Sequence, residues 1–515
     1  MSTKGMVATS QPLAVDAAIA VLKTGGNAVD AAVCAAAMLN VVEPMSTSIG
    51  GDCFAIVYEA KTGKLHGING SGRAPKAASI EALKAAGHQS MPQQGIYSVS
   101  VPGALHAWQS LLDKLGTKSL GEVLQPAIRA ATDGFELTPI IARDWAAQQH
   151  ELEQGVNTQH YLVNGCPPQL GENFKQPELA QSFSMVAEHG IKAFYDGPLT
   201  DKMVTQSEKL NGWLTHDDFG SHASEWVDPI STDYRGFTVC QLPPNGQGVI
   251  TLEALNILEG YDLRAMGLEE RTHVQIEALK LAFADAWQYV ADPAMVDVPT
   301  NTLISKTYAE QRRQLIGDQA LQDPTHGFPN SGTIYVTVVD AEGNAASFIN
   351  SIYMHFGSKV VAEGTGIVMQ NRAALSSLDP KHPNALAGGK RPYHTIIPPM
   401  VLKDGKPSIC FGVVGGFMQP QAQVQILNHV IDQGLNVETA LSAPRFRWME
   451  KAKVTFEPAF DQTVTEQLKD RNHDILDGSG FGGFGGAQAI MIDQSTDSLS
   501  GASDSRKDGC VGSID

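Results

Sequence analysis

Thr333 lies where a polar segment without apolar periodicity gives way to a β-forming run. Residues 315–332 are rich in Gln, Asp, Pro, Gly and Asn and have no apolar periodicity, which is typical of a mobile surface segment. From Thr333 to Val339 the sequence reads Thr-Ile-Tyr-Val-Thr-Val-Val, a strongly β-forming run. A mobile segment that ends in Ser331-Gly332, directly before a hydroxyl residue at the start of a strand, is what a self-cleaving N-terminal nucleophile requires.

The chemistry expected of such a threonine is cleavage of its own preceding peptide bond. The hydroxyl attacks the Gly332 carbonyl, and the C–N bond breaks to leave an ester and a free amine on Thr333. Hydrolysis of the ester then releases the Gly332 carboxylate and the hydroxyl, for which the new amine serves as general base. Gly332 suits this step because it lacks a Cβ and permits a strained peptide. Cleavage would divide one domain into residues 1–332, ending in the mobile linker of about residues 315–332, and residues 333–515. A strand that simply begins with Thr after a loop remains an open alternative.

A predicted hairpin places a second hydroxyl beside Thr333. Asp340-Ala-Glu-Gly-Asn344 has the composition of a tight turn, and the residues from Ala345 to Ser351 are predicted to form the return strand. If the turn passes through residues 341–343, Asp340 pairs with Asn344 and Thr333 lies opposite Ser351. Directly opposed side chains of antiparallel strands are about 5 Å apart, so we expect a hydrogen bond between the two hydroxyls.

Other predicted elements must hold this hairpin in place. Residues 12–22 and 27–40 are predicted as helices, the second one Ala-rich nearly all round and therefore buried. Residues 53–58 are predicted as a strand that leads into a hairpin turn, and residues 100–290 as mostly helical. The last third is expected to alternate short strands, Gly-rich turns and two helices, residues 420–433 and 437–443. The length of 515 residues allows about three domains, and one large layered α/β domain is the other possibility.

The bulk composition argues against several partners. The 515 residues carry a formal net charge of −18, the pI is near 5.2, and no dense Lys/Arg stretch occurs, so we expect no nucleic-acid partner. The longest apolar stretch, residues 31–42, is too short to span a bilayer, so we expect no membrane partner. The first residues lack a signal-peptide pattern, which predicts a cytoplasmic protein. The six scattered cysteines predict reduced thiols.

Two other enzyme classes have weaker support. Gly480-Phe-Gly-Gly-Phe-Gly485 fits the dinucleotide-binding pattern G-x-G-x-x-G, but a β-like run at residues 489–492 leaves no room for the helix that this fingerprint needs. The 15 histidines are dispersed and none forms an H-E-x-x-H motif. We therefore expect neither a cofactor nor a metal ion. A binding protein without catalytic activity stays open as an alternative.

Ordered matches to one enzyme family run along nearly the whole chain. The run from Thr333 to Asp340, with the following Glu-Gly-Asn344, is similar to the first strand and turn of that family's small subunit. Further matching motifs are Ala8-Thr-Ser-Gln-Pro-Leu-Ala14, Gly25-Gly-Asn-Ala-Val-Asp-Ala-Ala32, Ser48-Ile-Gly-Gly51, Val101-Pro-Gly103, Leu124-Gln-Pro-Ala127, Ala284-Asp285, Gly389-Lys-Arg-Pro392, Gly415-Gly416, Gly434-Leu-Asn436, Ala443-Pro-Arg-Phe446 and Gly501-Ala-Ser-Asp504. The sequence resembles the γ-glutamyltransferase branch of the N-terminal-nucleophile hydrolases. The resemblance implies a four-layer αββα fold with two central antiparallel sheets.

The resemblance also implies roles for the residues that match the family's catalytic positions. Thr333 would be the nucleophile and, after cleavage, the base. Ser351 matches the second hydroxyl residue, usually Thr, that supports the nucleophile. Gly415 and Gly416 match the glycine pair whose backbone N–H groups form the oxyanion hole. The large and small fragments would stay together as a heterodimer, which could dimerise further.

The substrate-binding positions depart from the family pattern. Family members that act on glutathione bind the glutamyl α-carboxylate with an Arg where this sequence has Ser71, and Arg73 follows two places later. The positions that hold the glutamyl α-amine are occupied by Tyr353 and residues 372–375, which include no acid. A pocket without this acid should prefer a negatively charged acyl group that has no adjacent ammonium.

Five residues are therefore the candidates for substrate binding. Arg73 and Arg372 are expected to bind a carboxylate. His394 and Thr395 replace the family's paired serines, and together with Gln419 they are expected to line the same pocket. These substitutions resemble a divergent subgroup that includes oxamate amidohydrolase, cephalosporin acylases and glutathione-hydrolase-like proteins. We predict hydrolysis of the amide of a small carboxylate-bearing substrate such as oxamate. γ-Glutamyl hydrolysis or transfer, and glutaryl or cephalosporin acylase activity, remain the alternatives.

Overall fold

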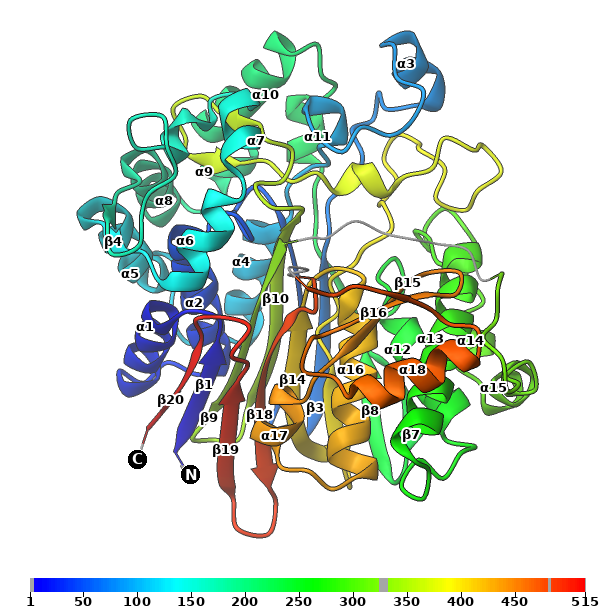
Figure 1. The fold of residues 1–515 in the computed structure, drawn as a ribbon. Helices are drawn as coiled ribbons and strands as arrows, with labels where there is room; N and C mark the ends of the chain where they lie inside the picture. Colours follow the sequence, from blue (N-terminus) through cyan, green and yellow to red (C-terminus); the bar gives the residue numbers. More distant parts are fainter. Residues whose placement is uncertain (1–3, 324–331, 480–482, 515) are drawn as a thin grey trace.

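Two antiparallel β-sheets lie face to face at the centre of the computed structural model, which describes residues 4–323, 332–479 and 483–514 (Figure 1). Within this part of the chain, the first sheet has seven strands in the order β20 (Cys510–Ser513), β1 (Gly5–Thr9), β9 (Gly332–Asp340), β10 (Ala345–Tyr353), β2 (Asp52–Glu59), β3 (Lys64–Gly70) and β6 (Glu225–Val227). The second sheet has six described strands in the order β19 (Ser498–Ser503), β18 (Gly486–Asp493), β14 (Lys406–Val414), β13 (Met400–Lys403), β8 (Phe237–Gln241) and β7 (Ile230–Tyr234).

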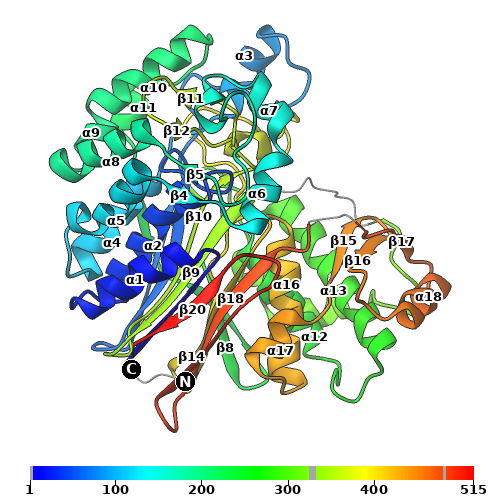
Figure 2. The same ribbon diagram turned by 60° about the vertical axis from the view of Figure 1, so that its left-hand side comes forward.

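Helices cover the outer face of each sheet (Figure 2). The first sheet packs against α1 (Pro12–Lys23), α2 (Ala28–Val42) and α4 (Ala104–Leu115), with α5 (Leu120–Asp133) and α8 (Pro177–His189) behind them. The second sheet packs against α12 (Gly248–Leu258), α16 (Met418–Leu427) and α17 (Val437–Ser442), with α13 (Leu268–Tyr289) behind α12. These layers confirm the predicted four-layer αββα fold.

The other described helices and strands lie outside the two central sheets. They are α3 (Ile80–Ala85), β4 (Phe135–Glu136), α6 (Pro139–Ala146), α7 (Gln149–Gln154), β5 (Asn173–Phe174), α9 (Lys192–Tyr195), α10 (Pro198–Lys209), α11 (His216–Gly220), α14 (Thr300–Leu303), α15 (Lys306–Arg313), β11 (Val361–Ala362), β12 (Ile367–Val368), β15 (Phe446–Glu450), β16 (Lys453–Phe456), α18 (Gln462–Asp470) and β17 (Asp474–Leu476). No described helix is long and apolar enough to cross a membrane. The six cysteines are free thiols, as predicted.

The predicted buried helix, α2, shows how the sequence builds the first helical layer. Asn27 caps its N-terminus, because the Asn27 Oδ1 accepts hydrogen bonds from the amides of Val29 (3.0 Å) and Asp30 (3.1 Å). Every residue of α2 is buried. Its small alanine side chains allow β9, β10 and α5 to pack closely around it.

Alternation along β9 explains where Thr333 points. Ile334, Val336 and Val338 belong to the apolar layer under the first set of helices. Tyr335 and Val339 face the other way and belong to the apolar layer between the two sheets. Because side chains along a strand alternate between faces, Thr333 shares the face of Tyr335 and points towards the second sheet.

Both sheets contain strands from before and from after Gly332. In the first sheet, β9 and β10 lie between β1 and β2. In the second, β13 and β14 lie beside β7 and β8, which come from the earlier segment. Both segments are therefore needed to complete each sheet.

The predicted linker before Thr333 is only partly described, because residues 324–331 lie outside the described part. Residues 315–323 form no helix or strand, as predicted. They are nevertheless held in place: the Ala320 amide donates to the Arg471 carbonyl at 2.8 Å, and Ala320 is buried. A backbone hydrogen bond thus connects this part to the rest of the molecule, and the mobility of the whole segment stays a prediction. Of the disfavoured glycine motif, residues 480–482 also lie outside the described residues, and the strand β18 begins directly after it.

Candidate active site

The hairpin of β9 and β10 has the predicted register. Asp340 and Asn344 close the turn through the Asp340 amide, which donates to the Asn344 carbonyl at 3.0 Å. Successive pairs up to Asn350 opposite Ile334 keep the same register, which brings Ser351 opposite Thr333. Thr333 Oγ1 and Ser351 Oγ are 3.1 Å apart, a hydrogen bond between two buried hydroxyls.

Ser351 is surrounded by further donors. Arg372 Nη2 donates to Ser351 Oγ at 3.1 Å, and the Tyr353 amide donates to the same oxygen at 2.9 Å. Tyr353 can do so because the strand is irregular between Asn350 and Tyr353, and Tyr353 has a φ of 77°. Arg372 also donates to Thr395 Oγ1 at 2.7 Å. This network fixes the Ser351 oxygen next to Thr333.

Arg372 brings a positive charge close to the two hydroxyls. Its guanidinium lies over the Tyr353 ring, 4.8 Å from the ring centroid. Burial lowers the pKa of Arg372 to about 10, so the side chain is still charged at neutral pH. A fixed positive charge at this distance favours negative charge on neighbouring oxygens.

The Gly415-Gly416 pair forms a turn between β14 and α16. The two residues have φ values of 114° and 60°, a region of backbone conformation that favours glycine. Within the described residues, neither glycine amide N–H takes part in a hydrogen bond, whereas Gly416 O accepts one from Gln247 Nε2 at 2.9 Å. Two backbone donors at the N-terminal end of a helix suit the binding of a negatively charged oxygen.

Thr333 and Gly415 line one cavity of about 490 Å³. Its charged lining residues are Arg143, Asp144, Glu151, Lys359, Arg447, Glu457, Arg506 and Lys507. The remaining lining residues are Gln94, Ala147, Gln148, Met354, His355, Gly357, Val414, Gly483, Phe484 and Gly485. Five of the lining side chains are cationic and three are acidic. Three of the cations form ion pairs, Arg143 with Asp144, Arg506 with Glu457 and Lys507 with Glu43.

Arg447 and Lys359 are the two buried cationic side chains that line the cavity, and burial lowers the pKa of each. Arg447 is 2% exposed, its pKa is lowered to about 10, and Nη1 donates to the Gly483 carbonyl at 2.7 Å. Lys359 donates to Gln148 Oε1 at 3.1 Å, and its pKa is lowered to about 8. Because a bound carboxylate would relieve the cost of burying these charges, both are well suited to hold one.

Arg73 does not line this cavity, contrary to the expectation from the sequence. Arg73 Nη1 donates to Asp292 Oδ2 and to the Gly389 carbonyl, both at 3.0 Å, and Nη2 donates to Glu225 Oε1 at 3.1 Å. The side chain is thus engaged in ion pairs that tie three segments together. Its proximity in sequence to the family's arginine position does not bring it to Thr333.

The other four predicted binding residues are buried but do not line the cavity. Arg372 and Thr395 belong to the hydroxyl network described above. His394 Nε2 lies 2.9 Å from Asp52 Oδ2, and burial lowers the pKa of His394 to about 4. Gln419 Oε1 accepts a hydrogen bond from the Ile397 amide at 3.1 Å.

Sequence reasoning missed Arg447, Lys359 and Lys507 as cavity residues. Arg447 directly follows one of the matching motifs, Ala443-Pro-Arg-Phe446, and this was the available signal. Lys359 and Lys507 lie in connections between strands, and only the folded chain shows that these connections meet at Thr333.

The chain is similar to known proteins over nearly its whole length. The profile of the family described as gamma-glutamyltranspeptidase matches residues 14–514. The glutathione hydrolase-like YwrD proenzyme of Bacillus subtilis is 39% identical, and the match covers 99% of this chain and 98% of the relative. The oxamate amidohydrolase proenzyme of Klebsiella pneumoniae is 33% identical, with coverages of 99% and 98%. A crystal structure of cephalosporin acylase from Bacillus halodurans has 43% identity and a TM-score of 0.95, and the match covers 100% of this chain and 96% of that one. The chain therefore belongs to the gamma-glutamyltranspeptidase family of N-terminal-nucleophile hydrolases.

Proposed function

We propose that the chain is a proenzyme that cleaves itself between Gly332 and Thr333 and then hydrolyses amides with Thr333 as the nucleophile. The observation that carries this proposal is the Thr333 hydroxyl, which is hydrogen-bonded to Ser351 and lines the same cavity as Gly415. The names of the two relatives above, which call them proenzymes, also support processing of this chain. The fragments 1–332 and 333–515 stay together as a heterodimer because they share both sheets.

In the cleaved enzyme, the new α-amine of Thr333 acts as the base. It takes the proton of the Thr333 hydroxyl while Oγ1 attacks the amide carbonyl of the substrate. The carbonyl oxygen becomes negative and accepts hydrogen bonds from the amides of Gly415 and Gly416, which contribute about 2.7–4 kcal/mol per donor to lowering the barrier. The C–N bond then breaks, the leaving amine takes the proton from the α-amine, and an ester to Thr333 remains.

Hydrolysis of this ester completes the cycle. The α-amine takes a proton from water, the hydroxide attacks the ester carbonyl, and the same backbone amides stabilise the oxygen. The C–O bond breaks, the acid leaves, and Thr333 Oγ1 regains its proton. Ser351, held by Arg372 and the Tyr353 amide, keeps the nucleophile oriented through both steps.

The substrate in this proposal is the amide of a carboxylate-bearing acyl group. Arg447 and Lys359, rather than Arg73, bind the carboxylate, because they line the cavity that contains Thr333. Oxamate satisfies this chemistry, and a relative that covers the whole chain is named for it. The cavity of about 490 Å³ is also a specific reason to consider longer acyl groups, such as glutaryl amides. Its volume is in the range of about 300–1,000 Å³ that holds drug-sized ligands, and oxamate fills only a small part of it.

A panel of amides tests this function. Cleaved enzyme is given oxamate, a glutaryl amide, the methyl ester of that glutaryl amide and a γ-glutamyl amide, and kcat/KM is measured for each. We expect the free carboxylates to be hydrolysed at least about tenfold faster than the neutral ester, because a charge-assisted hydrogen bond is worth about 1.5–3 kcal/mol. Thr333→Ala serves as the inactive control. Equal rates for acid and ester, or fastest turnover of the γ-glutamyl amide, would refute the proposed substrate class.

A further inference from the structure

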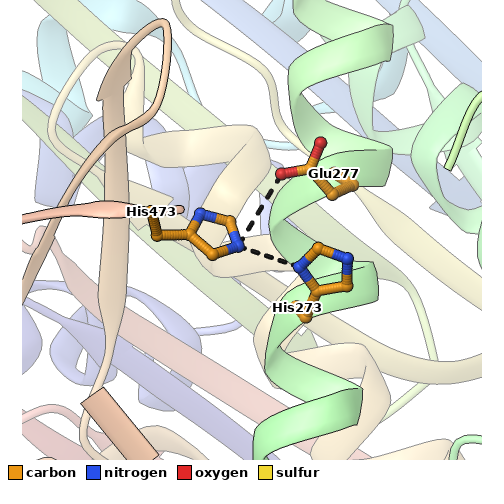
Figure 3. Close-up of side chains that lie close together, drawn as sticks. All are labelled: His273, Glu277 and His473. Atoms are coloured by element: carbon orange, nitrogen blue, oxygen red, sulfur yellow. Dashed lines mark hydrogen bonds and ion pairs between the residues drawn. The ribbon is translucent and has the colours of Figure 1, made fainter. Parts of the chain in front are cut away.

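Two histidines and a glutamate form a buried cluster away from the cavity of Thr333. His273 and Glu277 are four residues apart on α13, so their side chains lie on one face of this helix. His473 comes from the connection between α18 and β17 and points at the other two (Figure 3). All three side chains are buried, and none of them lines the cavity that contains Thr333.

The donor atoms of the three side chains converge. His473 Nε2 is 2.8 Å from His273 Nδ1 and 3.8 Å from Glu277 Oε1, and the three atoms lie within 4.8 Å of one another. Two imidazole nitrogens and one carboxylate oxygen are a ligand set of Zn²⁺, with bonds of about 2.0–2.2 Å and a water at the fourth position. A tetrahedral ion with such bonds keeps its ligand atoms about 3.3 Å apart, a spacing that small side-chain rotations reach from these positions.

A hydrogen bond of His273 Nε2 leaves Nδ1 of the same ring unprotonated, as metal binding requires. His273 Nε2 lies 2.8 Å from the Gly317 carbonyl oxygen, which can only accept, so this nitrogen carries the proton and Nδ1 offers a lone pair. A hydrogen bond from the second ring nitrogen to a backbone carbonyl is usual for histidine ligands of metals.

The cluster has a route to solvent, and Lys280 competes with an ion for the Glu277 oxygen. His473 also lines a second cavity of about 350 Å³, through which an ion can reach it. The competitor is Lys280, whose Nζ lies 2.7 Å from Glu277 Oε1 with both side chains fully buried. Because the ammonium and a metal ion need the same oxygen, binding of the ion must displace Lys280 from it. Lys280 Nζ keeps a second acceptor, the Leu321 carbonyl at 3.1 Å.

We propose that His273, Glu277 and His473 bind a divalent transition-metal ion, with Zn²⁺ as the preferred ion. His473 lies after Thr333 in the chain and the other two lie before it, so the ion links the two segments. The cluster also holds the described end of the linker, because the Gly317 carbonyl and the Leu321 amide are hydrogen-bonded to His273 and Glu277. The role of this ion is structural and independent of the hydrolysis proposed above.

Metal binding by the whole protein tests this site. Protein stripped with a chelator and dialysed is titrated with Zn²⁺ against a chromophoric chelator, and thermal unfolding is followed with and without Zn²⁺. We expect one ion per chain and a higher Tm with Zn²⁺. Co²⁺ in the same site should give the visible absorption bands of a tetrahedral ion. None of these readouts depends on enzymatic activity, so they do not fail when the proposed function fails.

Four variants test which side chains bind the ion. His473→Gln and Glu277→Gln each remove a ligand and should weaken Zn²⁺ binding by about 100-fold or more, beyond the loss typical of residues that only orient a ligand. Lys280→Met removes the competing charge and should tighten binding by about tenfold or more. His216→Gln, which changes an exposed histidine paired with Asp201, is the matched control and should bind as the wild type does.

The opposite results would overturn the site. The proposal is wrong if the wild type does not bind Zn²⁺ stoichiometrically, or if the ligand variants bind it as tightly as the wild type does. It is also wrong if Lys280→Met is the only protein tested that binds Zn²⁺. If His473→Gln does not fold, Glu277→Gln and Lys280→Met still decide the question, because they change the affinity in opposite directions.

Discussion

Replacing Ser351 with alanine tests the hydroxyl network beside Thr333. The substitution removes an oxygen that lies 3.1 Å from Thr333 Oγ1 and that accepts hydrogen bonds from Arg372 Nη2 at 3.1 Å and from the Tyr353 amide at 2.9 Å. All four residues are buried. The loss therefore affects both the orientation of the nucleophile and two donors that need an acceptor.

The expected magnitudes follow from these contacts. A buried donor left without an acceptor costs about 1–3 kcal/mol, so two donors lower the free energy of unfolding by about 2–6 kcal/mol. Loss of a hydrogen bond to the charged transition state raises the barrier by about 1.5–3 kcal/mol, which lowers kcat/KM by about 10- to 150-fold.

The assay compares Ser351→Ala with Ser351→Thr, which keeps the hydroxyl. The cleaved fraction of each variant is measured first, and kcat/KM is expressed per cleaved enzyme, so that slow processing is not mistaken for slow turnover. Urea unfolding gives the change in stability. Ser351→Thr should stay close to the wild type in both measurements. Wild-type kcat/KM for Ser351→Ala, or equal losses in both variants, would refute a role for this hydroxyl.

Three further predictions concern the cavity. Gly415→Ala should lower kcat by about 10²–10³-fold, because an added Cβ would lie 3.1 Å from Gly485 Cα and shift the amide that stabilises the oxyanion; unchanged kcat of the cleaved variant would argue against this role. For a carboxylate-bearing substrate, kcat/KM should fall as the pH rises through about 8, where Lys359 loses its proton, and Lys359→Met should abolish this decrease; a pH profile unaltered by the substitution would exclude Lys359. Arg447→Met should raise KM for the same substrate by about 10-fold or more, whereas Arg73→Ala should leave KM unchanged; the reverse pattern would restore Arg73 as the carboxylate ligand.

The hairpin could be predicted from the sequence because its determinants are local. The turn from Asp340 to Asn344 is closed by side-chain hydrogen bonds within five consecutive residues: Asp340 Oδ1 accepts from the amides of Glu342 and Asn344 at 3.0 and 2.9 Å. Once this turn is known, the two-residue period of the strands places Ser351 opposite Thr333. The buried α2 was predictable for the same reason, since its composition and its Asn27 cap are local features.

The substrate-binding residues could not be predicted in the same way, because their roles depend on contacts between distant segments. Arg73 is held by Asp292 and Glu225, which are far from it in the sequence. Arg447 lies on β15, and it reaches the cavity only because β15 packs against α13 and α16. Two of the three proposed metal ligands, His273 and Glu277, are local in sequence because they are four residues apart. Its third member is separated from His273 by 200 residues, and a search for H-E-x-x-H cannot find it.

The central claim, that Thr333 cleaves the chain and becomes its nucleophile, is tested most directly by intact mass measurement of the purified protein after denaturation. The account predicts two polypeptides for the wild type, residues 1–332 and residues 333–515, and a single full-length chain for Thr333→Ala. A full-length wild-type chain that still hydrolyses amides, or a Thr333→Ala chain that is cleaved before residue 333, would contradict it.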